Sequence, residues 1–254
     1  MTDGSDSTDS AGQEWHGRSL SGTGFDDDTG SADAGLVAAL ADPGDELRLM
    51  RAVAEARLLV PVVAAPTEID DSGDLAVEKS TDMAVVTLTA PDGQRALPVF
   101  SGVEALARWD EGARPSPVTS ARAAQAAVSE RCDVIVLDVG SPHQVVLRPS
   151  MVWALAQQRA WIPAHQDEHV RSAVAAAVRD DPAVEEVRCE DGSDAGPGVL
   201  RVVLGVRPGL SQNELREVAT RVGERIATDG EVRARIDGLA FALQAAGPAD
   251  PGGR

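Results

Sequence analysis

Hydrophobic and polar positions follow two different periods along most of the chain, and each period predicts one type of element. Valines at every fourth position indicate an amphipathic helix over residues 167–178. A β-branched run followed by turn residues indicates a strand over 83–89. A longer helix is expected over 211–228, because Ser211 and Glu214 fit the capping box at its start. The chain therefore mixes helices with strands.

The complete pattern predicts two small sheet-plus-helix units of the α+β (mixed α/β) class. The first unit has a helix after residue 45, strands at 58–63, 83–89 and 95–100, helices at 103–109 and 120–130, a strand at 133–137 and a helix at 150–157. The second unit has a helix at 167–178, strands at 184–190 and 199–206, a helix at 211–228 and a strand at 238–243. Pro115 and Pro117 are interpreted as a break between two helices.

Composition sets the boundaries of these units. Residues 1–44 are rich in Ser, Asp, Gly and Thr, and such a segment buries too little apolar surface to offset its ordering entropy. We therefore predict a disordered acidic tail (1–44), in which 36–40 is interpreted as a short helical turn. The segments that follow are a first domain (45–160), a linker (161–166), an α-β-β-α-β second domain (167–246) and a disordered tail (247–254).

The charge of the chain argues against two classes of partner, nucleic acids and membranes. The formal net charge is −18, and Lys79 is the single lysine. An acidic surface repels phosphate backbones and anionic lipid, so we expect neither a nucleic-acid partner nor a membrane partner. No apolar run is long enough for a membrane span, and no secretory signal is expected. Cys132 and Cys189 lie far apart and are interpreted as reduced thiols of a cytoplasmic protein.

Two motifs resemble catalytic or metal-binding patterns, and both favour a structural interpretation. His165 and His169 have the H-x-x-E-H spacing of a zinc site, but Pro163 places His165 outside the helix, so a solvated helix start is expected. Cys132 follows a helix, where the dipole raises a thiol pKa, although His143 is a potential partner across the next turn. We predict no catalytic residue, no metal and no cofactor.

The loop that follows the buried strand at 133–137 is the best candidate for a ligand-binding cleft. Asp138, Ser141 and His143 leave the end of a strand whose apolar run does not alternate, and such ends commonly line clefts in α/β sheets. The alternative is a tight turn in which Asp138 and Ser141 satisfy backbone groups. A small-molecule ligand at these three residues is therefore one expectation.

The first domain resembles the N-terminal domain of the SseB family (enhanced serine sensitivity protein B) of bacteria. The resemblance rests on Leu59-Val-Pro-Val62, on the block from Ala96 to Trp109 that reads ALPVFSGVEALARW, and on Cys132-Asp-Val-Ile-Val-Leu-Asp138. It covers about residues 45–158, and the second domain is similar in layout to the family's C-terminal domain. The resemblance implies a small partner- or ligand-binding module and brings no set of catalytic residues.

These observations together predict a non-catalytic protein of the bacterial cytoplasm that acts as a protein-interaction or regulatory module. The expected partner is another protein. One alternative is a small-molecule sensor linked to amino-acid (serine) metabolism, with its cleft near 138–143. A second alternative is an enzyme that uses Cys132 with His143, or His165 with His169.

Overall fold

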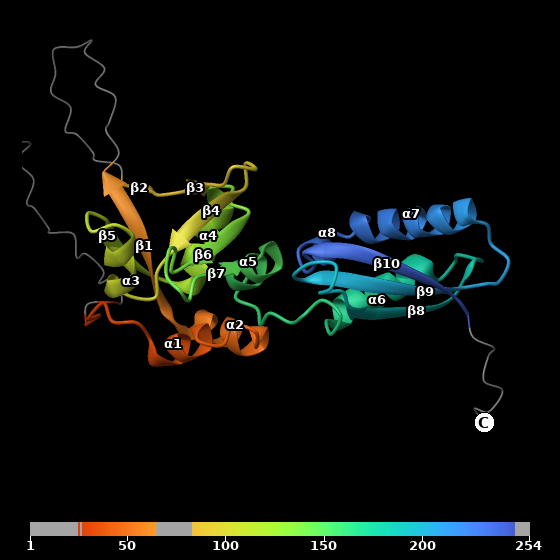
Figure 1. Ribbon diagram of the computed structural model, residues 1–254, viewed down its shortest axis with the longest axis horizontal. Helices are drawn as coiled ribbons and strands as arrows, with labels where there is room; N and C mark the ends of the chain where they lie inside the picture. The colour runs from red at the N-terminus through yellow and green to blue at the C-terminus, as the bar shows by residue number, and fades with distance from the viewer. Residues whose placement is uncertain (1–24, 26, 65–82, 247–254) are drawn as a thin grey trace, which may run out of the picture.

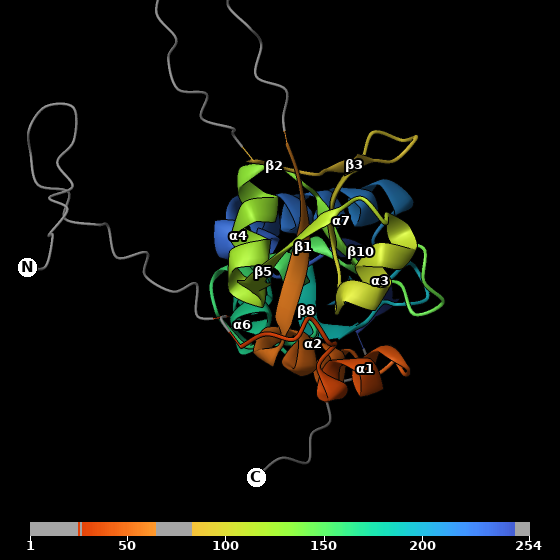
Figure 2. The same cartoon turned by 90° about the vertical axis from the view of Figure 1, so that its left-hand side faces the viewer.

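The computed structural model describes residues 25, 27–64 and 83–246, and these residues form two units side by side (Figure 1). The elements of the first unit are α1 (Ala34–Leu40), α2 (Glu46–Glu55), β1 (Arg57–Ala64), β2 (Met83–Val85), β3 (Leu88–Thr89), β4 (Arg95–Val99), α3 (Val103–Trp109), β5 (Arg114–Thr119), α4 (Ser120–Ser129), β6 (Val134–Leu137), β7 (Val145–Leu147) and α5 (Pro149–Ala156). Figure 2 views the molecule from the side of this unit.

The first unit contains two sheets that meet at one backbone bridge. The three-stranded sheet has the order β2-β1-β5, and the four-stranded sheet has the order β3-β4-β6-β7. Only β4 and β6 are parallel to each other in these two sheets. Leu59 and Phe100 exchange backbone hydrogen bonds of 2.8 and 2.9 Å and so join β1 to the end of β4.

Most of the apolar residues of the 96–109 block are buried or partly buried. Phe100 is 0% exposed, packs with Leu106, and its ring centroid lies 5.3 Å from that of Trp109. Phe100 is therefore a core residue of the first unit. Val103, at the start of α3, is 40% exposed.

The predicted N-terminal tail extends too far along the sequence. Residues 34–40 form α1, in which Leu36 and Leu40 are buried in the main core of the first unit. Asp33 caps this helix by accepting a hydrogen bond from the Leu36 N–H at 2.9 Å. The helical turn expected at 36–40 is present, but the tail prediction was wrong here because two leucines one turn apart, with an N-cap before them, are enough to dock a short helix. The tail residues 1–24 and the second predicted tail, 247–254, lie outside the described residues.

Pro115 and Pro117 do not break the chain but lie in strand β5. This strand is at the edge of its sheet, where proline is tolerated. Pro117 pairs with Leu59, whose N–H bonds to Phe100 on the opposite side. The pair is therefore a non-hydrogen-bonded pair of the antiparallel ladder, and the ladder needs no N–H from Pro117.

The strand expected over 83–89 is divided between the two sheets. β2 pairs with β1, whereas β3 pairs with β4 in an antiparallel hairpin. Between them, the Val86 N–H donates to the Pro61 carbonyl at 3.4 Å. A continuous β-branched run thus contributes to two different sheets.

The second unit has the predicted α-β-β-α-β layout, with one extra turn of helix before the last strand. Its elements are α6 (Glu168–Val178), β8 (Val184–Asp191), β9 (Val199–Val206), α7 (Gln212–Thr228), α8 (Gly230–Arg233) and β10 (Gly238–Ala245). The sheet order is β10-β9-β8, with β9 parallel to β10. Alternate β9 residues from Leu200 to Val206 share one buried cluster with α6 and α7, so both helices cover the same face. The capping box at Ser211 is present. The α+β class is confirmed.

The segment between the two units is packed against the first unit at its start. Trp161, the first residue of the expected linker, is buried, and its indole N–H donates to the Ser150 hydroxyl at 3.0 Å. None of the helices in the part of the chain that the structure describes is long and apolar enough to cross a membrane.

Candidate functional site

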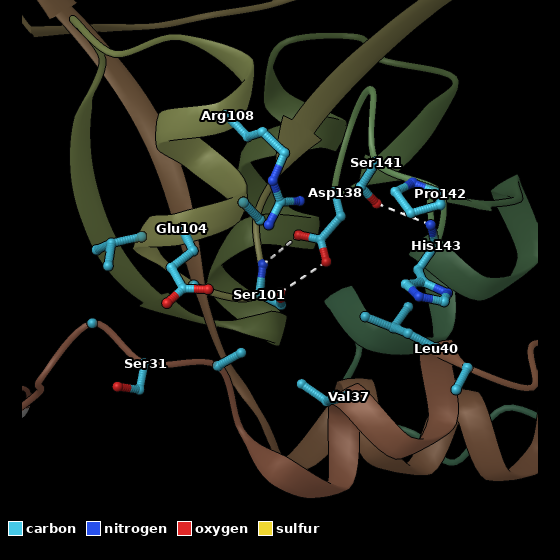
Figure 3. Close-up of a pocket in the computed structure, with 16 residues that line it drawn as sticks. Ser31, Val37, Leu40, Ser101, Glu104, Arg108, Asp138, Ser141, Pro142 and His143 are labelled. Atoms are coloured by element: carbon cyan, nitrogen blue, oxygen red, sulfur yellow. Dashed lines mark hydrogen bonds between the residues drawn. The ribbon is translucent and has the colours of Figure 1, made fainter.

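A pocket of about 640 Å³ lies on the first unit, at the edge where β4 and β6 end (Figure 3). Its walls come from residues 30–32, from α1, from the first turns of α3 and from the turn at 138–143. Because β4 and β6 are parallel, the segments that follow them emerge at the same edge of the sheet. The fold therefore brings together regions that are far apart in the sequence.

Asp138 connects the two strand ends at the base of this pocket. Its carboxylate accepts hydrogen bonds from the Ser101 N–H at 2.7 Å and from the Ser101 hydroxyl at 2.8 Å. Asp138 is buried and has a positive φ of 54°, a conformation that aspartate tolerates better than most residues. Both carboxylate oxygens are thus engaged in holding the turn at Ser101 next to the turn after β6.

The structure brings the three candidate residues Asp138, Ser141 and His143 to one pocket. Ser141 closes the turn, because its N–H donates to the Asp138 carbonyl at 3.0 Å and its hydroxyl accepts from the His143 N–H at 3.1 Å. Asp138 and Ser141 therefore have the turn-forming contacts that the sequence offered as the alternative. The side chain of His143, by contrast, is exposed at the pocket. Ligand binding by the three residues stays a prediction.

One wall of the pocket is formed by residues 30–32, which belong to a segment, 28–32, that the sequence placed in the tail. Arg57 holds this segment in place, because its guanidinium donates to the carbonyl of Ser31 at 2.7 Å and to the carbonyl of Ser101 at 3.0 Å. It also forms an ion pair with Asp28 at 2.7 Å. Burial acts to raise the pKa of Asp28, but the Gly30 N–H and Arg57 outweigh it and hold that pKa below its usual value.

Gly102 lets the same segment approach the start of α3. The Val103 N–H donates to the Gly30 carbonyl at 2.9 Å. A Cβ atom on Gly102 would lie 2.8 Å from the backbone nitrogen of Ala32 and 3.0 Å from the Gly30 oxygen. The only sequence signal for this wall was the spacing of Leu36 and Leu40, since the rest of the segment is polar and small.

The solvent-exposed part of the pocket carries apolar and charged side chains that are not packed in the core. Val37 from α1 is 50% exposed and Val103 from α3 is 40% exposed. Arg108 reaches over the pocket toward Asp138 (Figure 3), and it forms no ion pair with any residue that the structure describes. Glu104 lies one turn before Arg108 on the same wall. The site thus offers two apolar contacts, one guanidinium and one carboxylate.

The other sequence candidates do not assemble into reactive groups. Cys132 precedes β6, whereas His143 follows its far end, so the thiol and the imidazole stand at opposite ends of the strand. Burial raises the pKa of the Cys132 thiol, which disfavours the nucleophilic thiolate. His165 precedes α6 and lies 3.1 Å from the Gln166 amide, whereas His169 lies 3.7 Å from Asp229. Among the residues that the structure describes, no three His, Cys, Asp or Glu side chains are placed to hold a metal ion.

Comparison with known proteins agrees with the geometry of the first unit. Residues 33–154 match the family model of the SseB protein N-terminal domain. The match begins at Asp33, the N-cap of α1, and so includes the helix that lies outside the predicted first domain. No curated protein and no solved structure is similar enough to the chain to count as a match. Residues 33–154 are thereby identified as an SseB protein N-terminal domain.

Proposed function

We propose that this chain is a non-catalytic binding protein that acts as a protein-interaction or regulatory module, and that a partner protein inserts an apolar side chain into the pocket described above. The observation that carries the proposal is the pair of half-exposed valines, Val37 and Val103, in a concave site. Apolar side chains exposed in a groove with a polar rim are typical of interaction sites.

The charge of the chain indicates the kind of partner. With a net charge of −18, the protein attracts a partner whose surface is basic and raises the rate of encounter with it. We therefore propose a protein partner that presents an apolar side chain among basic residues. The two free thiols, Cys132 and Cys189, support the further proposal that this encounter takes place in the reducing bacterial cytoplasm.

The contacts of the pocket residues support a binding role over catalysis. A nucleophile is activated by a base within hydrogen-bond reach. The Ser141 hydroxyl instead accepts the His143 backbone N–H, and the buried Asp138 carboxylate holds the Ser101 turn through its N–H and hydroxyl, so the hydrogen bonds of these two residues organise the turns. The remaining charged or titratable side chains of the pocket, Glu104, Arg108 and His143, suit recognition of a bound group.

Photo-crosslinking in cells tests the position of the partner. A photoreactive amino acid at position 37 should capture a partner protein, whereas the same residue at position 146 should not. Val146 is a matched control, because it is 44% exposed on β7 and does not line the pocket. The captured partner should also lose affinity for purified Val103→Asp protein but retain it for Val146→Asp protein. Equal capture at both positions would contradict the proposal.

A small-molecule ligand is the second candidate, and the volume of the pocket favours it. About 640 Å³ lies within the usual range for small-molecule sites. Arg108 then indicates a carboxylate, because guanidinium binds carboxylates with two parallel hydrogen bonds. Thermal unfolding with a panel of free amino acids and other carboxylic acids tests this function. A shift in melting temperature that disappears in Arg108→Gln would favour the sensor, and a flat panel would favour the protein partner.

A further inference from the structure

The sheet of the second unit has two edges of opposite character. At one edge, β8 reads VEEVRCED and carries five charged residues in eight, with Arg188 paired to Glu186 at 2.6 Å. At the other edge, β10 reads GLAFALQA and carries no charged residue. Charged side chains on an edge strand prevent pairing with another chain. The β8 edge is therefore protected against pairing with another chain, whereas the β10 edge is free to pair.

The apolar side chains of β10 are only partly covered by the unit itself. Leu243 is 36% exposed, whereas Leu204, its partner in β9, is 0% exposed. Leu239 and Phe241 are also only partly buried, although they belong to the cluster that α6 and α7 cover. Within the described residues, β10 has hydrogen bonds to β9 on one side and to no strand on the other. This strand can therefore accept another strand at its outer edge.

The order of residues in β10 identifies the chain itself as the strand that fits. Residues 239–243 read LAFAL, which is the same in both directions. Antiparallel pairing centred on Phe241 would place Leu239 opposite Leu243 of the second copy, and Phe241 opposite its own counterpart. Because directly opposite residues share a face, every leucine and phenylalanine would stay on the helix-covered side in both copies.

We propose that two copies of this chain associate through β10, so that two three-stranded sheets become one six-stranded sheet. The orientation avoids a clash between the first units, because β10 begins next to the first unit, at Asp237, and runs away from it. In an antiparallel pair the two first units therefore lie at opposite ends of the joined sheet. The pocket on each first unit stays open.

The net charge of the chain makes the association dependent on salt. Each copy carries −18, so the two copies repel each other at long range, whereas the strands that meet are uncharged. Salt screens charges beyond a Debye length of about 8 Å at physiological ionic strength. The dissociation constant of the dimer should therefore fall as salt is added.

Sedimentation equilibrium on the full chain, over a wide concentration range, tests the proposal. We expect a dimer for the native chain. The double variant Ala240→Glu and Ala242→Glu should raise its dissociation constant about tenfold or more, because like charges would then stand opposite each other in both pairs. These alanines lie on the face away from the helices, so the unit should still fold, which circular dichroism checks. The matched control, Arg188→Glu, adds a carboxylate to the same face at the β8 edge and should leave the dimer intact.

A charge-swap experiment separates loss of pairing from loss of fold. The double variant Ala240→Lys and Ala242→Lys should also be monomeric alone, but it should form a mixed dimer with the glutamate variant. Mixed dimers that form only from the two opposite variants would establish the β10 register. A native chain that stays monomeric at the highest concentration would overturn the proposal. A dimer that survives both double variants would place the interface elsewhere and overturn it as well.

Discussion

The Arg148 guanidinium donates from Nε to Asp237 Oδ2 at 2.9 Å and so joins the residue before α5 to the residue before β10. Ser150 adds two hydrogen bonds to the same carboxylate, from its N–H and from its hydroxyl, each of 2.8 Å. The second unit is packed closely here, since a Cβ on Gly198 would lie 2.6 Å from Arg148 Nε. The Asp237 carboxylate of the second unit thus accepts three hydrogen bonds from the first unit.

Replacement of Asp237 should uncouple the two units. Burial acts to lower the pKa of Arg148, but its hydrogen bonds to Glu46 and Asp237 outweigh it and raise that pKa. Asp237→Ala would leave the buried Ser150 N–H without its acceptor, at a cost of about 3 kcal/mol to the contact. We expect the native chain to unfold in one calorimetric transition and Asp237→Ala to unfold in two.

The exposed contact between Arg159 and Glu231 provides the control. These groups are 3.6 Å apart, and an ion pair of this kind contributes about 1 kcal/mol or less. Glu231→Ala should therefore leave one transition. If Asp237→Ala also unfolds in one unshifted transition, the contact at Asp237 does not couple the units.

Truncation of Phe100 should destabilise the first unit. The side chain is fully buried between β1 and α3, and removal of a core aromatic costs about 3–5 kcal/mol. Urea unfolding followed by tryptophan fluorescence measures the loss in Phe100→Ala. Val146→Ala removes an exposed apolar side chain and should change the free energy of unfolding by less than about 0.5 kcal/mol. Equal stability of the two variants would contradict the core position of Phe100.

A side chain at Gly102 should displace the wall of the pocket formed by residues 30–32. The Cβ of Gly102→Ala would approach two backbone atoms, which cannot rotate away as a side chain can, and such overpacking costs about 1–3 kcal/mol. Hydrogen exchange should increase at the Gly30 and Val103 amides. Gly112→Ala is the matched control, since its Cβ would meet only the Asp110 carboxylate at 3.3 Å. Unchanged exchange in Gly102→Ala would show that the wall does not depend on this contact.

The sequence predicted the second unit better than the first because the signals there are local. The valines of α6 and the capping box at Ser211 each lie within one helix, and all three strands were located within two residues. In the first unit, by contrast, the decisive contacts are non-local. Pro117 is compatible with a strand only because β5 is an edge, which depends on β1 as its partner.

In the candidate site, too, only the part that depends on local sequence was predicted. The turn at 138–143 was found because it follows a buried strand, and this part of the pocket depends on local chain order. The opposite wall depends on Arg57, whose hydrogen bond to the carbonyl of Ser31 spans 26 residues. The spacing of hydrophobic residues gives no information about a hydrogen bond between residues so far apart in the sequence. The polar segment 28–32 was therefore predicted to belong to the tail.

Acidification should destabilise the second unit through Asp181. Burial acts to raise the pKa of this carboxyl, but the Ala183 N–H and Arg221 outweigh it and hold the pKa below its usual value. A lowered pKa in the folded state means that the carboxylate stabilises the fold above the unfolded pKa of about 3.9. This contribution is lost as the pH falls through the folded pKa. We therefore expect Asp181→Asn to cost about 1–3 kcal/mol at neutral pH.

Urea unfolding at a series of pH values measures the effect of Asp181. The difference between native protein and Asp181→Asn should be constant from neutral pH down to about pH 5 and should shrink below about pH 4, because the native carboxyl then takes up a proton. The exposed neighbour Asp180 is the control, and Asp180→Asn should follow the native curve. A difference that persists unchanged at low pH would show that the asparagine disturbs packing in the loop before β8. The stabilisation would then not come from the ionised carboxylate that accepts the Arg221 hydrogen bonds.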